Sequence, residues 1–200
     1  MIRGLILAAG SGSRFGQNKL LACLPNGQPI ALASAMSMRG VVDGISAVLN
    51  PESETLTNLF LSEQISILSC SQSRLGIGHS IACGVTSTED AQGWIIALAD
   101  MPFIKTSTIE AVVSTLRKGA LIAAPIFAGK RGHPVGFSRD LYSELVALKG
   151  DIGARALLKQ YSSQVVEIEC DDLGIHIDID IPTDLEKYSR ELFGPVHGKD

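Results

Sequence analysis

Short runs of apolar residues alternate along this chain with longer stretches in which apolar residues recur every three or four positions. An uninterrupted apolar run that ends at a turn-forming residue is typical of a strand buried on both faces of a parallel sheet. We expect strands at residues 4–8, 44–49, 65–68, 94–99, 121–125, 134–137, 165–169 and 175–179.

The longer stretches have the helical period and lie mostly between the expected strands. We expect helices at residues 30–39, 52–62, 79–87, 107–118, 139–148, 152–160 and 183–192. This alternation predicts βα units, and therefore an α/β fold around a doubly wound, mostly parallel sheet. The 200 residues fit one domain, which we place at 1–193, and the Gly- and charge-rich stretch 194–200 is expected to be a flexible tail.

The composition narrows the class of protein. With 46% hydrophobic residues and a net charge of −4, the chain is typical of a globular protein and not of a disordered chain or a general nucleic-acid binder. No apolar run approaches the roughly 20 residues of a membrane span, and the N-terminus has no basic leader. The four cysteines form no C-x-x-C pair, which favours a reducing cytoplasm.

The first expected strand leads into a glycine-rich turn with two basic residues close behind it. Gly10, Gly12 and Gly16 allow a tight turn that aims backbone N–H groups at an anion. Arg14 and Lys19 add positive charge where a triphosphate would lie. The spacing fits neither the dinucleotide fingerprint G-x-G-x-x-G nor the P-loop. The alternative to a phosphate loop is an ordinary Gly/Ser surface turn.

Asp100 directly follows the expected strand 94–99. Ligands of open α/β sheets bind beyond the carboxyl ends of the strands. A carboxylate in that place suits Mg²⁺, which prefers oxygen ligands and shares them with substrate phosphates. The alternative is that Asp100 only caps the following loop or helix.

A second acidic stretch lies near the end of the chain. Asp178 and Asp180 take alternate positions at the end of the expected strand 175–179, so their side chains face the same way. Two neighbouring carboxylates repel each other unless a cation joins them, and a divalent cation would do so. The alternative is an exposed edge with solvated acids.

The first turn closely resembles the signature of nucleotidyltransferases that handle the molybdenum cofactor, since it reads Leu7-Ala8-Ala9-Gly10-x-x-x-Arg14-Phe15-Gly16-x-x-Lys19-Leu20-Leu21. The resemblance implies a Rossmann-like, three-layer fold of the nucleotide-diphospho-sugar transferase type. It also implies a loop that wraps the triphosphate, with Arg14 and Lys19 as catalytic groups. The implied nucleotide contacts are Leu7, Ala8, Ala9, Gly10, Gly12, Ser13, Arg14 and Lys19.

Both acidic stretches resemble the same family. The segment Asp100-Met101-Pro102 resembles its Asp-Met-Pro motif, whose aspartate binds the catalytic metal. Residues 178–184 resemble its Asp-x-Asp-Thr-Pro-x-Asp pattern, with Ile181 in place of the usual threonine. The resemblance implies Mg²⁺, or Mn²⁺, on Asp100 and Asp180, with Asp178 behind them, and it leaves Asp184 as an acid in the first turn of the last helix.

Two further segments extend the match. Residues 75–85 resemble a Gly-x-Gly-x-Ser segment that contacts the nucleoside, in which the glycines permit close approach to a base or ribose. Residues 129–137 resemble an Arg-Gly-His-Pro turn near the second substrate, and an ordinary basic hairpin turn is the alternative. The implied nucleoside contacts are Gly76, Gly78 and Ser80, and the implied acceptor contacts are Lys130, Arg131 and His133; His79 is either a ligand contact or a capping or surface residue.

The resemblance implies transfer of a nucleoside monophosphate to a phosphate, with release of pyrophosphate. Ala9 makes the first turn similar to that of the cytidylyltransferases, whereas guanylyltransferases tend to have Gly there. We therefore expect CMP transfer from CTP to the molybdenum-bound pterin cofactor. The implied protein partner is an apo molybdoenzyme, and neither nucleic acid nor a membrane is expected as a partner.

Three other functions stay open at this point. The first is the same chemistry with GTP or with another phosphate acceptor. The second is a non-catalytic chaperone of the cofactor, against which Arg14, Lys19 and Asp100 argue. The third is a nicotinamide-dependent oxidoreductase, against which the glycine spacing argues.

Overall fold

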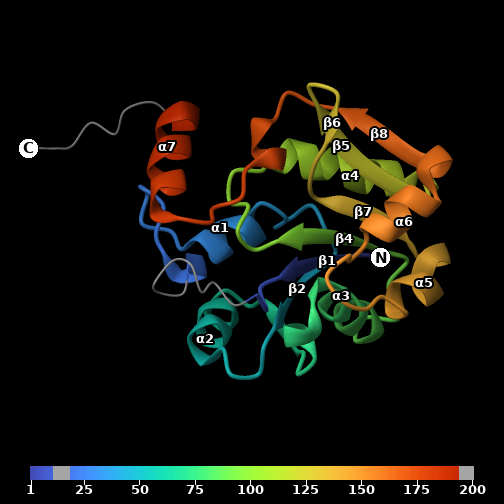
Figure 1. Ribbon diagram of the computed structural model, residues 1–200, viewed down its shortest axis with the longest axis horizontal. Helices are drawn as coiled ribbons and strands as arrows, with labels where there is room; N and C mark the ends of the chain where they lie inside the picture. The colour runs from blue at the N-terminus through green and yellow to red at the C-terminus, as the bar shows by residue number, and fades with distance from the viewer. Residues whose placement is uncertain (11–18, 194–200) are drawn as a thin grey trace, which may run out of the picture.

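The structure is a computed structural model that describes residues 1–10 and 19–193. The strands among these residues belong to one sheet, whose order is β3-β2-β1-β4-β7-β5-β6, with β8 paired to β5 (Figure 1). Their bounds are β1 (Ile2–Leu7), β2 (Gly44–Leu49), β3 (Ser66–Ser69), β4 (Gly93–Leu98), β5 (Ile122–Phe127), β6 (Lys130–Arg131), β7 (Val135–Ser138) and β8 (Val165–Glu169).

The sheet is mostly parallel, as the alternation of strands and helices predicted. The neighbours β3, β2, β1 and β4 run parallel to one another, and β8 runs parallel to β5. The exceptions are β7, which lies antiparallel between β4 and β5, and the two-residue β6, which pairs antiparallel with β5. The carboxyl ends of β1 and β4 therefore meet at one edge of the sheet, where an α/β protein binds its ligands.

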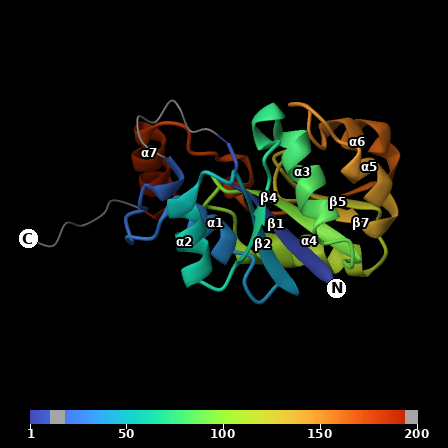
Figure 2. The same ribbon diagram turned by 90° about the horizontal axis from the view of Figure 1, so that it is seen from below.

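Helices cover both faces of the sheet (Figures 1 and 2). Residues of α1, α2 and α4 pack on one face, and residues of α3, α5 and α6 pack on the other. No helix among the described residues is long and apolar enough to cross a membrane. The helix bounds are α1 (Ile30–Met36), α2 (Glu54–Ser62), α3 (Ile77–Thr86), α4 (Thr106–Arg117), α5 (Tyr142–Val146), α6 (Arg155–Gln160) and α7 (Pro182–Phe193).

The buried strands explain the continuous apolar runs in the sequence. In β4, Ile95 packs on the α1–α2–α4 face, whereas Trp94 and Ile96 pack on the α3–α5–α6 face. Because successive side chains point to opposite faces, a strand that is covered on both sides must be apolar at every position. A smaller cluster, formed by α1, α7 and neighbouring loops, includes Ile30, Ile177 and Ile179.

The expected strand at 175–179 is wrong. Residues Leu173–His176 form a 3₁₀ turn, and an extended segment without sheet pairing follows them. The alternation that suggested a strand is real, since Ile177 and Ile179 are buried whereas Asp178 and Asp180 are exposed. The two-residue strand β6 was not expected, and the expected tail at 194–200 lies outside the described residues.

Asp172 sets the turn that replaces the expected strand. Its carboxylate is 1% exposed. Its Oδ1 accepts the Gly174 N–H at 3.0 Å. Its Oδ2 accepts the Lys105 N–H at 2.8 Å and the Thr108 hydroxyl at 2.6 Å. The carboxylate therefore joins the 172–180 segment to the start of α4.

Replacing this carboxylate should destabilise the fold. We expect Asp172→Ala to lower the free energy of unfolding by about 3 kcal/mol, because three donors lose a charged acceptor in a buried place. Urea denaturation at neutral pH measures the loss. Asp171→Ala is the matched control, since it removes the exposed neighbouring carboxylate and should change stability by less than about 0.5 kcal/mol. Equal effects of the two variants would contradict the role given to Asp172.

Candidate active site

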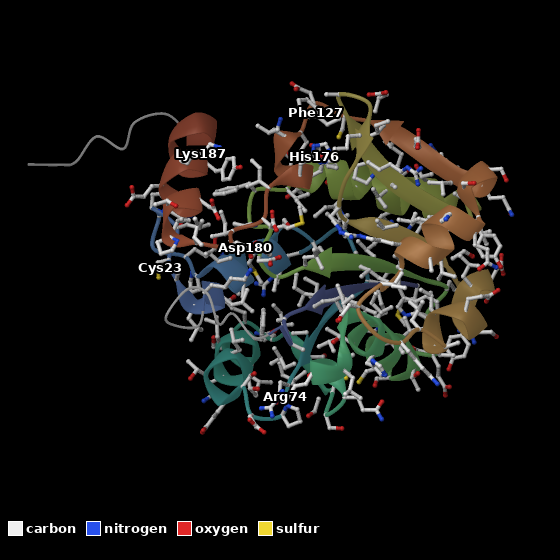
Figure 3. All side chains as sticks on the ribbon, viewed as in Figure 1. Cys23, Arg74, Phe127, His176, Asp180 and Lys187 are labelled. Carbon is white, nitrogen blue, oxygen red and sulfur yellow. The ribbon has the colours of Figure 1, made fainter. Side chains whose placement is uncertain are left out.

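Lys19 joins the two acidic segments that the sequence singled out. Its Nζ lies 2.8 Å from Asp100 Oδ2 and 2.7 Å from Asp180 Oδ1. Asp100 lies two residues after the end of β4, and Figure 3 shows Asp180 near the arrowhead of that strand. The structure thus brings together three of the predicted site residues at the carboxyl edge of the sheet.

The negative charges of Asp100 and Asp180 stabilise the positive charge of Lys19. The side chain of Lys19 is 14% exposed, and those of Asp100 and Asp180 are 23% and 51% exposed. Burial acts to lower the pKa of Lys19, but hydrogen bonds to Asp100 and Asp180 and their negative charges outweigh it, so the pKa is raised. Lys19 is therefore a protonated ammonium at neutral pH.

Backbone contacts hold the two carboxylates in place. The Ile179 N–H donates to the Asp100 carbonyl at 2.9 Å, which ties the 177–180 segment directly to the end of β4. The buried hydroxyl of Ser34 in α1 donates to the neighbouring Ala99 carbonyl at 2.9 Å. Sequence reasoning did not single out Ser34 or Ile179, because no motif marks a residue that acts through a main-chain bond.

Asp184 fixes the backbone that carries Asp180. Its Oδ2 accepts the N–H groups of Asp180 and Ile181, both at 2.9 Å. Asp184 also lies in the first turn of α7, where the sequence placed it. A carboxylate at a helix N-terminus is stabilised by the helix dipole and by the free N–H groups there. Asp184 therefore fixes the backbone of Asp180 in a position from which its carboxylate reaches Lys19.

Asp178 lies in the same electrostatic field, but within residues 1–10 and 19–193 it forms no hydrogen bond or ion pair with Lys19. Burial raises the pKa of Asp178, and the negative charges of Asp180 and Asp100 raise it further. Between the two candidates that the sequence left open, Asp180 is the one whose carboxylate shares a cation with Asp100.

The donor set suits a hard divalent cation. Asp100 and Asp180 both direct a carboxylate oxygen at one positive charge, and oxygen ligands are what Mg²⁺ and Mn²⁺ prefer. Among the described residues no group of three or more metal-ligating side chains is assembled. Two protein carboxylates are typical of a Mg²⁺ site that completes its coordination with water and substrate phosphates.

The first turn is described only as far as Gly10. Leu7 and Ala8 are 8% and 2% exposed and pack in the core, and the Ala8 N–H already donates to the Val48 carbonyl. Ala9 is half-buried and Gly10 is exposed, so their backbone is the part that faces outward. The predicted nucleotide contacts Gly12, Ser13 and Arg14 lie outside the described residues.

Gly76 and Gly78 serve a contact within the protein. A Cβ on Gly76 would lie 2.3 Å from the Gly150 carbonyl carbon, and one on Gly78 would lie 2.8 Å from the Lys149 backbone. The Gly78 N–H also donates to the Gly150 carbonyl at 2.8 Å. The backbone of Lys149 and Gly150 and the side chain of Asp151 therefore fill the space in front of these glycines. The contact of Gly76 and Gly78 with a base or ribose stays a prediction.

The neighbouring polar residues support the same contact. Nδ1 of His79 accepts the Gly150 N–H at 3.2 Å, so the ring holds the 149–151 loop. Ser80 is 4% exposed. It lies inside α3, whose N-cap residue is Gly76 and has no side-chain cap, so Ser80 does not cap the helix. Its contact with the nucleoside stays a prediction.

The three predicted acceptor contacts are placed differently from one another. Lys130 and Arg131 are exposed on β6, three strand positions from β4, which is roughly 14 Å. Arg131 Nε pairs with Glu167 Oε1 on β8 at 2.8 Å. The backbone N–H of His133 donates to the Ile175 carbonyl at 3.1 Å, which ties this residue to the segment that leads to Asp180. The roles of all three in acceptor binding stay predictions.

His133 is a neutral imidazole at this site. Burial lowers its pKa, against the effect of Asp100 and together with the positive charge of Arg155. Its Nδ1 is buried and has no hydrogen-bond partner within the described residues. Arg155, at the start of α6, was not among the predicted site residues.

A mostly parallel sheet that is covered by helices and carries charged groups at its carboxyl edge is Rossmann-like, and nucleotidyltransferases are one class of protein with this architecture. The chain belongs to the MobA-like family within that class, because the model of the MobA-like NTP transferase domain matches residues 4–165. The resemblance that the sequence motifs indicated is thereby confirmed at the level of the family.

Similar proteins agree with this assignment over almost the whole chain. The purine catabolism protein PucB of Bacillus subtilis is 32% identical, with 94% of this chain and 96% of that protein covered. The nicotine blue oxidoreductase of Paenarthrobacter nicotinovorans is 25% identical, with 90% and 92% covered. The structure of Rv0371C of Mycobacterium tuberculosis in complex with manganese has a TM-score of 0.77 at 21% identity, with 96% and 99% covered, which shows the shared fold.

The packing of Gly76 gives a direct test of the loop contact. Gly76 has a φ of +118° and no room for a Cβ, whereas Gly119 has a φ of +96° and nothing within 4 Å of the Cβ position. We expect Gly119→Ala to cost about 1 kcal/mol of stability through backbone strain alone. Gly76→Ala should cost about 3 kcal/mol or more, because the added methyl group also displaces the 149–151 loop.

Urea denaturation measures both losses, and amide hydrogen exchange locates them. The Gly78 N–H should exchange faster in Gly76→Ala only, since it loses the Gly150 carbonyl. Equal stability losses with unchanged exchange at Gly78 would show that the crowding is absent in solution.

Proposed function

We propose that this nucleotidyltransferase transfers CMP from CTP to the terminal phosphate of the molybdenum-bound pterin cofactor and releases pyrophosphate. The observation that carries the proposal is the convergence of Asp100 and Asp180 on a single positive charge beside the first turn of the sheet. Phosphoryl-type transfer asks the protein mainly for positioning and for neutralisation of negative charge. A site built from one ammonium and two carboxylates offers both.

Lys19 supplies the permanent positive charge in this scheme. Its raised pKa keeps the ammonium charged, so it neutralises the β- and γ-phosphates together with Arg14 and the amides of the loop. Asp100 and Asp180 are the residues that would hold Mg²⁺ or Mn²⁺. Such an ion, when bound, withdraws charge from the phosphates and so favours attack on the α-phosphorus and loss of pyrophosphate.

The acceptor needs no general base. A phosphate monoester is ionised near neutral pH, because its second pKa is about 6. An oxygen of the acceptor phosphate therefore attacks the α-phosphorus in line, and the bond from that phosphorus to the β-phosphate oxygen breaks. His133, held neutral by burial, can accept or donate a hydrogen bond near Asp100 without adding a charge.

The choice of CTP follows from the first turn. Ala9 carries a Cβ where guanylyltransferases tend to have Gly, and this narrows the space for a purine. The family match supports a nucleotide substrate, and the manganese complex of Rv0371C supports a divalent cation. The proposal places the reaction in the cytoplasm, with an apo molybdoenzyme as the receiver of the product. Lys130, Arg131 and His133 are the proposed acceptor contacts.

A pyrophosphate-release assay tests the proposal. Purified protein with Mg²⁺ is given CTP, GTP, ATP or UTP, each with and without molybdenum cofactor. We expect release with CTP only when the cofactor is present. Asp100→Asn should lower the rate by about 100-fold or more, the scale of losing one preorganised charge at the reacting phosphates.

Asp140→Asn is the matched control, because Asp140 is an exposed acid on a surface turn, and its rate should equal that of the wild type. Release with GTP instead of CTP would place the protein among the guanylyltransferases. If the protein binds the cofactor but releases no pyrophosphate from any nucleotide, the proposed enzymatic function is wrong and the protein is a cofactor chaperone.

A further inference from the structure

Lys19 occupies the place between the two carboxylates that a divalent cation would need. The same two oxygens, Asp100 Oδ2 and Asp180 Oδ1, lie 2.8 Å and 2.7 Å from its Nζ. The side chain of Lys19 is 14% exposed, so this ammonium is largely withdrawn from water and depends on the carboxylates for its hydrogen bonds. The pairing is therefore more than a surface ion pair between solvated side chains.

A metal ion and this ammonium would repel each other if both were bound to the same carboxylate oxygens. A Mg²⁺ ion binds carboxylate oxygens at about 2.1 Å. An ion on Asp100 Oδ2 would therefore lie within about 5 Å of Lys19 Nζ, given the 2.8 Å from that oxygen to the nitrogen. Like charges at that separation repel, and the repulsion is stronger where water is partly excluded.

We propose that Lys19 is a built-in competitor of the divalent cation, which holds Asp100 and Asp180 until the triphosphate gives the ammonium another partner. The charges favour this exchange. Two carboxylates with one ammonium leave a net charge of −1, so a metal ion is attracted but has to displace an existing partner. A bound triphosphate supplies several negative oxygens, to which the ammonium moves while the ion takes the carboxylates. The direction of the exchange rests on the proposed function, which places the triphosphate beside Lys19.

The structure supports a fixed site for this exchange. Asp100 is tied to the 177–180 segment through the Ile179 N–H, and the Asp180 backbone is held by Asp184. The two carboxylates therefore stay close when the ammonium leaves. Lys19 is the first residue of a 3₁₀ turn, Lys19–Leu21, and a lysine side chain has enough rotatable bonds to change partners without a backbone movement.

Binding of Mn²⁺ alone tests the competition. Free Mn²⁺ is measured by electron paramagnetic resonance during titration of the protein at neutral pH, with no nucleotide and no acceptor present. We expect Lys19→Met to bind Mn²⁺ about tenfold more tightly than the wild type, which corresponds to about 1.4 kcal/mol. Lys19→Arg, which keeps a cation in place, should bind Mn²⁺ as weakly as the wild type.

Two controls locate the effect. Lys118→Met changes the net charge by the same amount at an exposed position after α4, and it should leave the Mn²⁺ affinity unchanged. The double variant Lys19→Met/Asp100→Asn should lose the added affinity, because one of the two carboxylates is gone. Thermal melting establishes that each variant is folded, and Lys19→Gln serves for the same comparison if Lys19→Met is not.

Folded Lys19→Met or Lys19→Gln that binds Mn²⁺ no more tightly than the wild type would overturn the inference. The same holds if Lys118→Met tightens binding equally, since the effect would then be general electrostatics. Because the titration contains no CTP and no cofactor, a failure of CMP transfer leaves this result intact. A failure of the titration likewise leaves the transfer assay intact.

Discussion

The site depends on the requirement that two carboxylates brought together be matched by positive charge. Asp100 follows β4, and Asp180 precedes α7, 80 positions further along the chain. Without a cation their approach would be unfavourable, as the rise in the pKa of nearby Asp178, caused by burial and then by these charges, indicates. Lys19 supplies that charge from a third segment, so the ion pairs connect the start, the middle and the end of the fold.

The sheet topology makes this meeting possible. β1 and β4 are parallel neighbours, so the segment after β1 and the residue after β4 leave the sheet at the same edge. The 172–180 segment is then brought to that edge by contacts that are not part of the sheet. The buried carboxylate of Asp172 accepts hydrogen bonds from the start of α4. The side chains of Ile177 and Ile179 pack in the cluster with α1, and the Ile179 N–H donates to the Asp100 carbonyl. A buried carboxylate, apolar packing and one backbone hydrogen bond thus hold this segment in place, as strand pairing does for the other segments.

Much of this could be predicted from the sequence, and the failures have physical causes. Strands buried on both faces, such as β4, have a continuous apolar pattern, and its short length and flanking turn residues favour a strand over a helix. Ile177 and Ile179 alternate with acids as in a strand, but periodicity reports which side is buried and not whether a partner strand exists. Gly76 was recognised as necessary, yet its reason, the backbone of residue 150, lies far away in the sequence and leaves no local signal.

The recognition of a nucleotide also depends partly on residues that have a local sequence signal and partly on contacts between distant segments. Phosphates are recognised by charge and by backbone N–H groups, so the sequence indicates Lys19 and Asp100 as candidates for phosphoryl-transfer chemistry. A base is recognised by the shape of its pocket, which depends on how distant segments pack, as the contact of α3 with the 149–151 loop illustrates. The loop takes the space in front of Gly76 and Gly78, close in the chain to Ser80, whose contact with the nucleoside is a prediction. Nucleotide preference in this family should therefore depend on the 149–151 loop as well as on the residue at position 9.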